Sequence, residues 1–273
     1  AMIGVLSFYT AGGKYYWLIP SEYPFVVGPF AYRNYFAILV ELILPITLYF
    51  AFRERRNWAF YAAAVAIMYG TVLATGSRSG TGLLTVELLV LLFLIPTRGL
   101  SRGKGFGSVF ARVLLLIAAF TVISGYELIL QRFQMEDPYV TRREFLLSSI
   151  EMVKDRPLWG FGLGTWTIAY PAYAIIDTGL FANHAHNEWI QWAAEGGIPF
   201  VILMAAIPIL SIRPAFRTVW GIGILAVYAH AWVDYPFYRL GLAAWTFVLL
   251  GILHSYDPSG DDDSRRHSAG MEE

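Results

Sequence analysis

The sequence predicts an all-α fold: a polytopic transmembrane helical bundle with a large extracytoplasmic loop. Hydrophobic residues make up 57% of the 273 residues and charged residues only 15%, against about 25% charged residues in a typical soluble domain. One globule of this size cannot hide so much apolar surface, so lipid must cover part of it. The composition also excludes an intrinsically disordered chain, and it excludes a coiled coil, which needs abundant charge.

Charge and cysteine content narrow the function classes. Lys and Arg total 20, as do Asp and Glu, so no global basic field is available for nucleic acid. The absence of cysteine excludes a disulfide framework, a thiolate nucleophile and a cysteine metal site. No basic segment followed by an apolar run opens the chain, so we expect no cleavable signal.

Apolar runs approaching the ~20 residues needed to cross a bilayer mark the expected spans. They lie at 35–52, 58–74, 80–96, 109–130, 188–210, 219–233 and 240–253. The chain then divides into an interfacial extracytoplasmic segment (1–34), a first group of membrane helices (35–130), an extracytoplasmic loop carrying helices and the catalytic motif (131–187), a second group of membrane helices (188–254) and a disordered cytoplasmic tail (255–273).

Basic residues in short loops set the expected orientation. Alternate loops carry Arg53, Arg55 and Arg56, then Arg98, Arg102, Lys104 and Arg112, then Arg213 and Arg217. Positive charge of this kind marks the cytoplasmic side. The turn at 76–80, the loop 131–187 and the turn at 234–239 then lie on the opposite face, which is periplasmic in a diderm bacterium.

Several arginines occur on this outer face. Arg78 lies in the turn Gly76-Ser77-Arg78-Ser79-Gly80 between two apolar spans, where a charge is costly unless it reaches water, an anion or a partner. Arg33 precedes the first span. Two interpretations are open for each of these two arginines: an anchor at the membrane interface, or a guanidinium group that binds phosphate through two hydrogen bonds. Arg142 and Arg143 open an amphipathic helix that should end at Asp155-Arg156-Pro157.

The glycine-rich stretch at 160–165 has the spacing of a nucleotide loop. No strand precedes it and no Gly-Lys-Ser/Thr follows, so the sequence favours a backbone turn near a ligand or a packing interface.

The densest polar cluster is Asn183-His184-Ala185-His186-Asn187-Glu188. Histidines at i and i+2 cannot share one helical face, and Asn183 or Asn187 is a candidate cap for the next helix. A structural role, a metal site and a general base are all open. The general base is favoured because neutral imidazole accepts a proton near pH 7 and no HExxH-like spacing supports a metal. His230 and Asp234, four residues apart, are expected to pair structurally.

Taken together, these groups suit one reaction class. Guanidinium groups suit a diphosphate leaving group and a histidine suits deprotonation of a hydroxyl, whereas acyl transfer lacks a convincing Ser or Cys nucleophile. The combination favours transfer of a group from a lipid-linked diphosphate to a hydroxyl. Trp159, Trp166, Tyr170 and Tyr173 are candidates for stacking on sugar rings, or they are residues of the interfacial aromatic belt.

The same residues resemble the O-antigen ligase and polymerase family of bacterial membrane glycosyltransferases. The resemblance runs through GPFAYRNYFA, ATGSRSG, TRREFLLSSIEMVKDRPLWGFGLGTW, HAHNEWIQWAAEGGIP and HAWVDYP, in this order. It implies a glycosyltransferase C-like fold, a glycan donor on undecaprenyl diphosphate, and transfer at the periplasmic face of the inner membrane without metal or cofactor. By position, His186, followed by Asn187, matches the base, Arg78 and Arg142 match the diphosphate ligands, and Arg33 is a weaker match.

The predicted function is therefore an O-antigen ligase-like glycosyltransferase of lipopolysaccharide biosynthesis in the cell envelope. His186, Arg142 and Arg78 are the expected catalytic residues, and Arg33, Arg143, His184, Asn187 and Ser77 are expected to bind substrate. The acceptor would be a hydroxyl of the lipid A core; alternatives are an O-antigen or exopolysaccharide polymerase, a protein O-oligosaccharyltransferase and a non-enzymatic transporter of lipid-linked glycans. Family members usually carry more spans, so we expect either a preceding N-terminal bundle or a short member.

Overall fold

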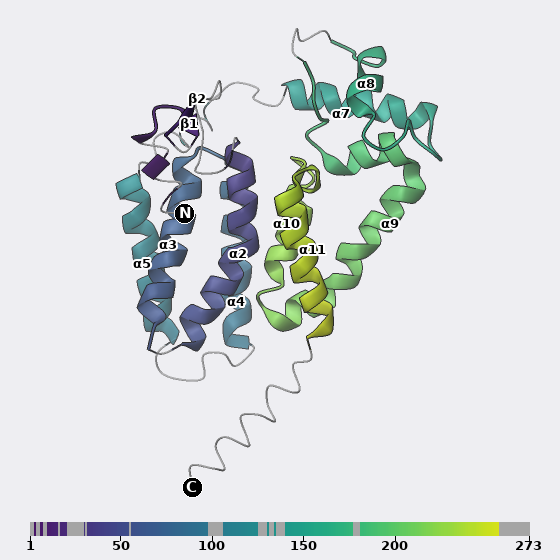
Figure 1. Cartoon of the computed structure of the whole chain (residues 1–273). Helices are drawn as coiled ribbons and strands as arrows, with labels where there is room; N and C mark the ends of the chain where they lie inside the picture. Colours follow the sequence, from purple (N-terminus) through teal and green to yellow (C-terminus); the bar gives the residue numbers. More distant parts are fainter. Residues whose placement is uncertain are drawn as a thin grey trace.

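The computed structural model describes residues 3, 6–7, 10–15, 17–20, 30, 32–54, 56–97, 106–124, 130, 134, 140–176 and 181–256. The described chain is mostly helical, which confirms the all-α prediction (Figure 1). A short antiparallel pair, β1 (Lys14–Tyr15) and β2 (Ile19–Pro20), lies near the N-terminus. Half of the predicted interfacial segment 1–34 and nearly all of the predicted tail 255–273 lie outside the described residues.

Four apolar helices form the first bundle. They are α2 (Arg33–Arg53), α3 (Trp58–Ala74), α4 (Arg78–Thr97) and α5 (Phe106–Ser124), which stand side by side in Figure 1. Leu44, Leu48, Val65, Leu91 and Ile95 are buried between them. Each helix occupies one of the apolar runs in the sequence, although α5 ends at Ser124 and the predicted extension to 130 falls largely outside the described residues.

The second group consists of α9 (Glu188–Thr218), α10 (Ile222–His230) and α11 (Leu240–Ser255), with a short 3-10 turn, η2 (Pro236–Tyr238), before α11. The helix α9 is broken at Gly197, which has φ 75° and ψ 175°. Large apolar side chains on α9 such as Leu203 and Leu210 are exposed. Helices with apolar residues on their outer faces are typical of membrane spans.

By length and composition, three of the described helical segments are sufficient to cross a membrane: Arg33–Arg53, Arg78–Ile95 and Glu188–Thr218. The apolar helices Trp58–Ala74, Ala111–Val122 and Leu240–Ser255 are shorter. These apolar helices indicate an integral membrane protein. The orientation across the bilayer, and with it the extracytoplasmic place of residues 131–187, stays a prediction.

A small helical cap lies against the first turns of α9. It comprises α7 (Val140–Asp155), α8 (Trp166–Ala169) and the 3-10 turn η1 (Tyr170–Ala172), seen beside the N-terminal end of α9 in Figure 1. Its core is formed by Phe145, Met152, Trp166, Tyr170 and Ala194. The predicted amphipathic helix before Pro157 is confirmed, and this cap holds the segment that leads into the histidine cluster.

Candidate active site

Side chains from separate parts of the chain converge on the carboxylate of Asp234, which is fully buried just after α10. Asn34 Nδ2 in the first turn of α2 donates a hydrogen bond to Asp234 Oδ2 at 2.5 Å. Arg142 Nη2 of α7 lies 3.9 Å from the same oxygen. His186 Nδ1 lies 3.6 Å from Asp234 Oδ1, an ion-pair distance rather than a hydrogen bond. Two of the predicted site residues, Arg142 and His186, therefore share one anionic partner.

The cluster extends to the start of α4. Ser77 Oγ donates to Asn34 Oδ1 at 2.7 Å, and it accepts a bond from Gly80 N at 3.2 Å, which caps the helix. Ser77 is thus linked through one amide to Asp234. Arg33 and Arg78 are the residues next to Asn34 and Ser77, so the sequence places both guanidinium groups at this end of the bundle.

Arginines open several helices at this end. Arg33 and Arg78 are the first residues of α2 and α4, Arg142 lies in the first turn of α7, and Arg239 directly precedes α11. A cation near a helix N-terminus opposes the helix dipole and costs roughly 0.3–1 kcal/mol. None of these four helices has an acidic residue in its first turn to offset that cost. Positive helix ends combined with guanidinium groups form a strong environment for an anion.

His186 is held in an uncommon backbone conformation. Its φ is 51°, in the left-handed region that non-glycine residues rarely adopt. On one side, Ala185 N donates to Gln191 Oε1 at 3.0 Å; on the other, Asn187 Oδ1 caps α9 by accepting from Ile190 N at 3.1 Å. The expected capping role of Asn187 is confirmed, and it fixes where the helix begins. Strained backbone of this kind persists only where its surroundings over-determine it.

The imidazole of His186 packs between aromatic rings. It stacks on Phe145 at a centroid distance of 6.3 Å and meets Tyr235 edge-on at 5.0 Å. The side chain is 26% exposed, yet Nδ1 is buried. The solvent-exposed surface of the His186 side chain therefore belongs to atoms other than Nδ1. In the neutral tautomer that carries its proton on Nδ1, toward Asp234, Nε2 is the ring nitrogen that can accept a proton.

The charge on Asp234 suits this arrangement. Burial by itself would raise the pKa of Asp234, but the neighbouring His186 imidazole, the Arg142 guanidinium and His230 together hold that pKa below its ordinary value. The carboxylate is therefore ionised at neutral pH, and it can stabilise positive charge that forms on His186.

His184 is a neutral, packed side chain. It stacks on Tyr235 at 4.1 Å and on Tyr238 at 4.8 Å, and its Nδ1 lies 3.2 Å from Gln191 Nε2. Burial, followed by the charges of Arg239 and His186, lowers the pKa of His184 to about 4. Because the amide nitrogen of Gln191 donates, His184 Nδ1 accepts. The two histidines consequently differ: one is locked among tyrosines, and the other faces the carboxylate.

The glycine-rich stretch is a packing interface, as one of the sequence alternatives predicted. Phe161 N and Gly162 N donate to the carbonyls of Ala194 and Glu195 at the break in α9. A Cβ at Gly160 would lie 2.4 Å from the backbone of Glu195, so only glycine allows this approach. The Glu195 carboxylate then accepts from Gly164 N and Trp166 N.

Two interpretations from the sequence are wrong. His230 does not pair with Asp234: its Nδ1 lies 2.9 Å from Glu41 of α2, because the intervening residues turn Asp234 away toward α7. Trp166 and Tyr170 stack on each other in the cap core and are buried, so they do not offer faces to sugars. Arg143 lies on the exposed side of α7, about 100° around the helix from Arg142.

Asp234 and Asn34 belong to this cluster but were not among the predicted site residues, and Asp234 was expected only to pair structurally with His230. A sequence signal existed for each: Asp234 is an acidic residue in a short turn between apolar spans, and Asn34 follows an arginine at the start of one. Both positions place a polar group where burial demands a partner.

A model of the O-antigen ligase family matches residues 63–205, which is more than half of the chain. The match covers Arg78, Arg142 and His186, and it ends before Asp234. No curated protein and no solved structure matched the chain in the corresponding comparisons. The chain belongs to the O-antigen ligase family.

Proposed function

We propose that this protein transfers a glycan from undecaprenyl diphosphate to an acceptor hydroxyl at the periplasmic face of the inner membrane. Membership of the O-antigen ligase family implies ligase- or polymerase-like activity on lipid-linked glycans. The observation that carries the specific site is the convergence of His186 and Arg142 on the buried carboxylate of Asp234.

In this proposal His186 is the general base. Its Nε2 takes the proton from the acceptor hydroxyl while the oxygen attacks the anomeric carbon of the donor sugar. The bond from that carbon to the diphosphate oxygen breaks in the same step, and the anomeric configuration inverts. Asp234 orients the ring and stabilises the imidazolium that forms. A positioned base of this kind contributes typically ~10²–10⁴-fold.

Arg78 and Arg142 hold the diphosphate. The leaving group gains negative charge as the glycosidic bond breaks, and pre-positioned guanidinium forks stabilise that charge in a site of low polarity. Their charge neutralises the leaving group without a metal. The positive ends of α2, α4 and α7 act in the same direction.

The remaining predicted residues support these groups. Ser77 positions Asn34, and Asn187 fixes the start of α9 after His186. His184 sets the position of Tyr235 through ring stacking. Arg33, next to Asn34, adds positive charge at the same end, and Arg143 on the exposed side of α7 is suited to contact the glycan or lipid headgroups instead of the diphosphate.

We favour the lipid A core as acceptor because the histidine motif most resembles the ligase branch of the family. Polymerisation onto a growing glycan and transfer to a protein hydroxyl use the same chemistry with another acceptor. A direct assay with purified lipid-linked glycan, offered in parallel to lipid A core, to unlinked glycan and to acceptor protein, separates these three.

One observation favours the alternative of a lipid-linked glycan transporter. Glu41, Glu87 and His230 are buried inside the bundle, with His230 Nδ1 2.9 Å from Glu41. Intramembrane ionisable groups often mark transport pathways. Movement of a lipid-linked glycan across proteoliposomes without any acceptor would support transport, and its loss in Glu87→Gln with transfer intact would assign these groups to it.

The test of the transferase is a pair of histidine variants in proteoliposomes. We expect His186→Ala to lower turnover by ~10²–10⁴-fold without loss of membrane insertion. His254→Ala is the matched control, because His254 lies near the end of α11 and contacts Ser211 instead of the Asp234 cluster. Turnover of the His186 variant equal to that of the control would refute the base.

A further inference from the structure

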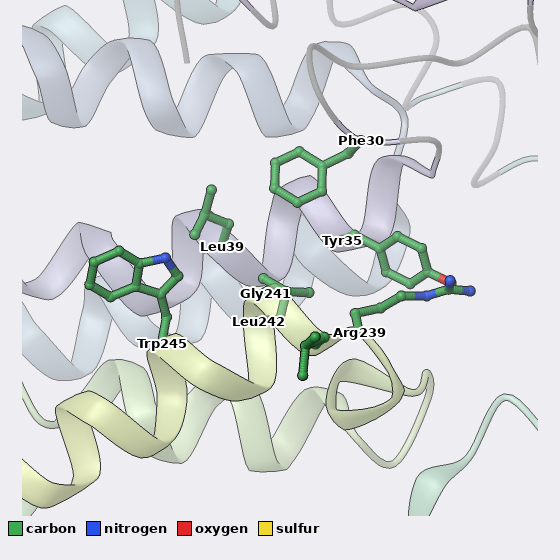
Figure 2. Close-up of a pocket in the computed structure, with 8 residues that line it drawn as sticks. Phe30, Tyr35, Leu39, Arg239, Gly241, Leu242 and Trp245 are labelled. Atoms are coloured by element: carbon green, nitrogen blue, oxygen red, sulfur yellow. The ribbon is translucent and has the colours of Figure 1, made fainter. Parts of the chain in front are cut away.

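A groove lies between the first turns of α2 and α11, beside the candidate active site. It has a volume of about 410 Å³, and its lining includes Phe30, Tyr35, Leu39, Arg239, Leu242 and Trp245. Figure 2 shows Phe30, Leu39 and Trp245 between the two helices, with Arg239 extended alongside Tyr35. Trp245 is 60% exposed although it is apolar, which indicates that this side of the groove faces lipid.

Arg239 gives the groove one charged end. Its Cζ lies 4.4 Å from the ring centroid of Tyr35 and 5.1 Å from that of Tyr235, and its Nη2 donates to Tyr235 Oη at 3.4 Å. Within the described part of the chain, no carboxylate forms an ion pair with Arg239. A half-buried guanidinium that contacts two tyrosines and no carboxylate of the described residues keeps its charge available to an anionic ligand.

This charged end lies next to the reacting groups. The Tyr235 ring that Arg239 contacts also meets His186 edge-on at 5.0 Å and stacks on His184 at 4.1 Å. One aromatic ring therefore separates the guanidinium from the imidazole. A ligand whose anionic group lies near His186 can continue past Arg239 into the apolar groove and then into the bilayer.

We propose that this groove binds the first isoprene units of a polyisoprenyl diphosphate donor, with Arg239 contacting its diphosphate. The inference rests on the proposed function and adds the lipid-binding part of that site. A diphosphate joined to an apolar chain matches both the cationic end and the apolar walls. The volume lies toward the lower end of the range for ligand sites, so most of the long chain stays in the membrane.

A groove-filling variant with a matched control tests this. A Cβ at Gly241, which lines the groove, meets no atom within 4 Å, so Gly241→Leu projects into open space in a helix. Gly251→Leu is the same change in open space on the same helix, roughly 15 Å along its axis. We expect Gly241→Leu in nanodiscs to weaken binding of undecaprenyl diphosphate by about tenfold or more, and Gly251→Leu to bind like wild type.

Further measurements keep the inference refutable if Gly241→Leu does not fold. Arg239→Gln should weaken binding of undecaprenyl diphosphate by about tenfold and leave any binding of undecaprenol unchanged. Unchanged diphosphate affinity in Arg239→Gln or Gly241→Leu would overturn the proposal. The proposal would also be overturned if phosphatidylglycerol displaced bound undecaprenyl diphosphate as well as unlabelled undecaprenyl diphosphate does. That result would mean that ordinary membrane lipid fills the groove. Loss of binding in the groove variants with normal binding in Arg142→Gln would support the groove and contradict the proposed diphosphate site.

Discussion

Replacing Asp234 with asparagine removes a charge while keeping the shape of the side chain. The charged carboxylate of Asp234 lies 3.6 Å, through Oδ1, from His186 Nδ1. Two unit charges at that separation interact by about 4–5 kcal/mol at an effective dielectric constant of ~20. Since the proton is only partly transferred in the transition state, we assign about half, roughly 2 kcal/mol, to the barrier. That corresponds to a decrease of about 30-fold in kcat.

The assay is steady-state glycan transfer in proteoliposomes, with kcat and donor KM measured separately. We expect donor KM to change less than about threefold, because Arg142 keeps its charge and loses only a partner 3.9 Å away. Asp155→Asn is the matched control: Asp155 ends α7 and accepts from the Tyr173 hydroxyl, away from Asp234. If the Asp234 variant retains wild-type kcat, or loses only donor affinity, the assigned orienting role is wrong.

Stability should fall as pH drops from ~6.5 toward 4, because the folded His184 has a pKa of about 4 and the unfolded chain binds its proton first; His184→Gln should flatten that dependence in thermal unfolding, and an unchanged slope would contradict it. Gly197→Ala should destabilise by at least ~1–3 kcal/mol, because its φ is 75° and the new Cβ would lie 2.2 Å from Leu158 O, whereas Gly251→Ala should not; equal melting temperatures would refute this. Arg78→Lys should raise donor KM and also lower kcat, since lysine keeps the charge but lacks the fork that binds the diphosphate and stabilises it as it leaves; unchanged kinetics would remove Arg78 from the diphosphate site.

The helices could be predicted from the sequence because their signal is local. An apolar run of about 20 residues needs no partner to be recognised, and α2, α3 and α4 begin and end within a few residues of the predicted runs. The break in α9 is different: it depends on Gly197 accepting a positive φ and on the loop at 157–162 replacing the lost helical hydrogen bonds. These hydrogen bonds are tertiary contacts, so the hydrophobic periodicity of the sequence cannot predict them.

The candidate site follows the same division. The residue types of the site could be predicted from the sequence, because arginines and histidines beside apolar spans are costly unless they have a partner or a function. Their partners were not, since Asn34 and Asp234 are 200 positions apart and meet only through the packing of α2 against α10. The local spacing of His230 and Asp234 suggested a pair, but burial of Glu41 in the facing helix supplied a closer partner for His230. The spacing of four residues between His230 and Asp234 therefore predicted the partner of His230 less well than the packing of α2 against α10 did.

We propose that Arg78, Arg142 and His186 serve one glycan-transfer site. A structure of the protein in nanodiscs with bound undecaprenyl diphosphate tests it most directly. We expect the diphosphate to lie within hydrogen-bond distance of the Arg78 and Arg142 guanidinium groups, with the leaving oxygen close to the exposed edge of the His186 ring. A diphosphate bound at the far end of α2, or on the outer surface of α7 away from Asp234, would contradict the account.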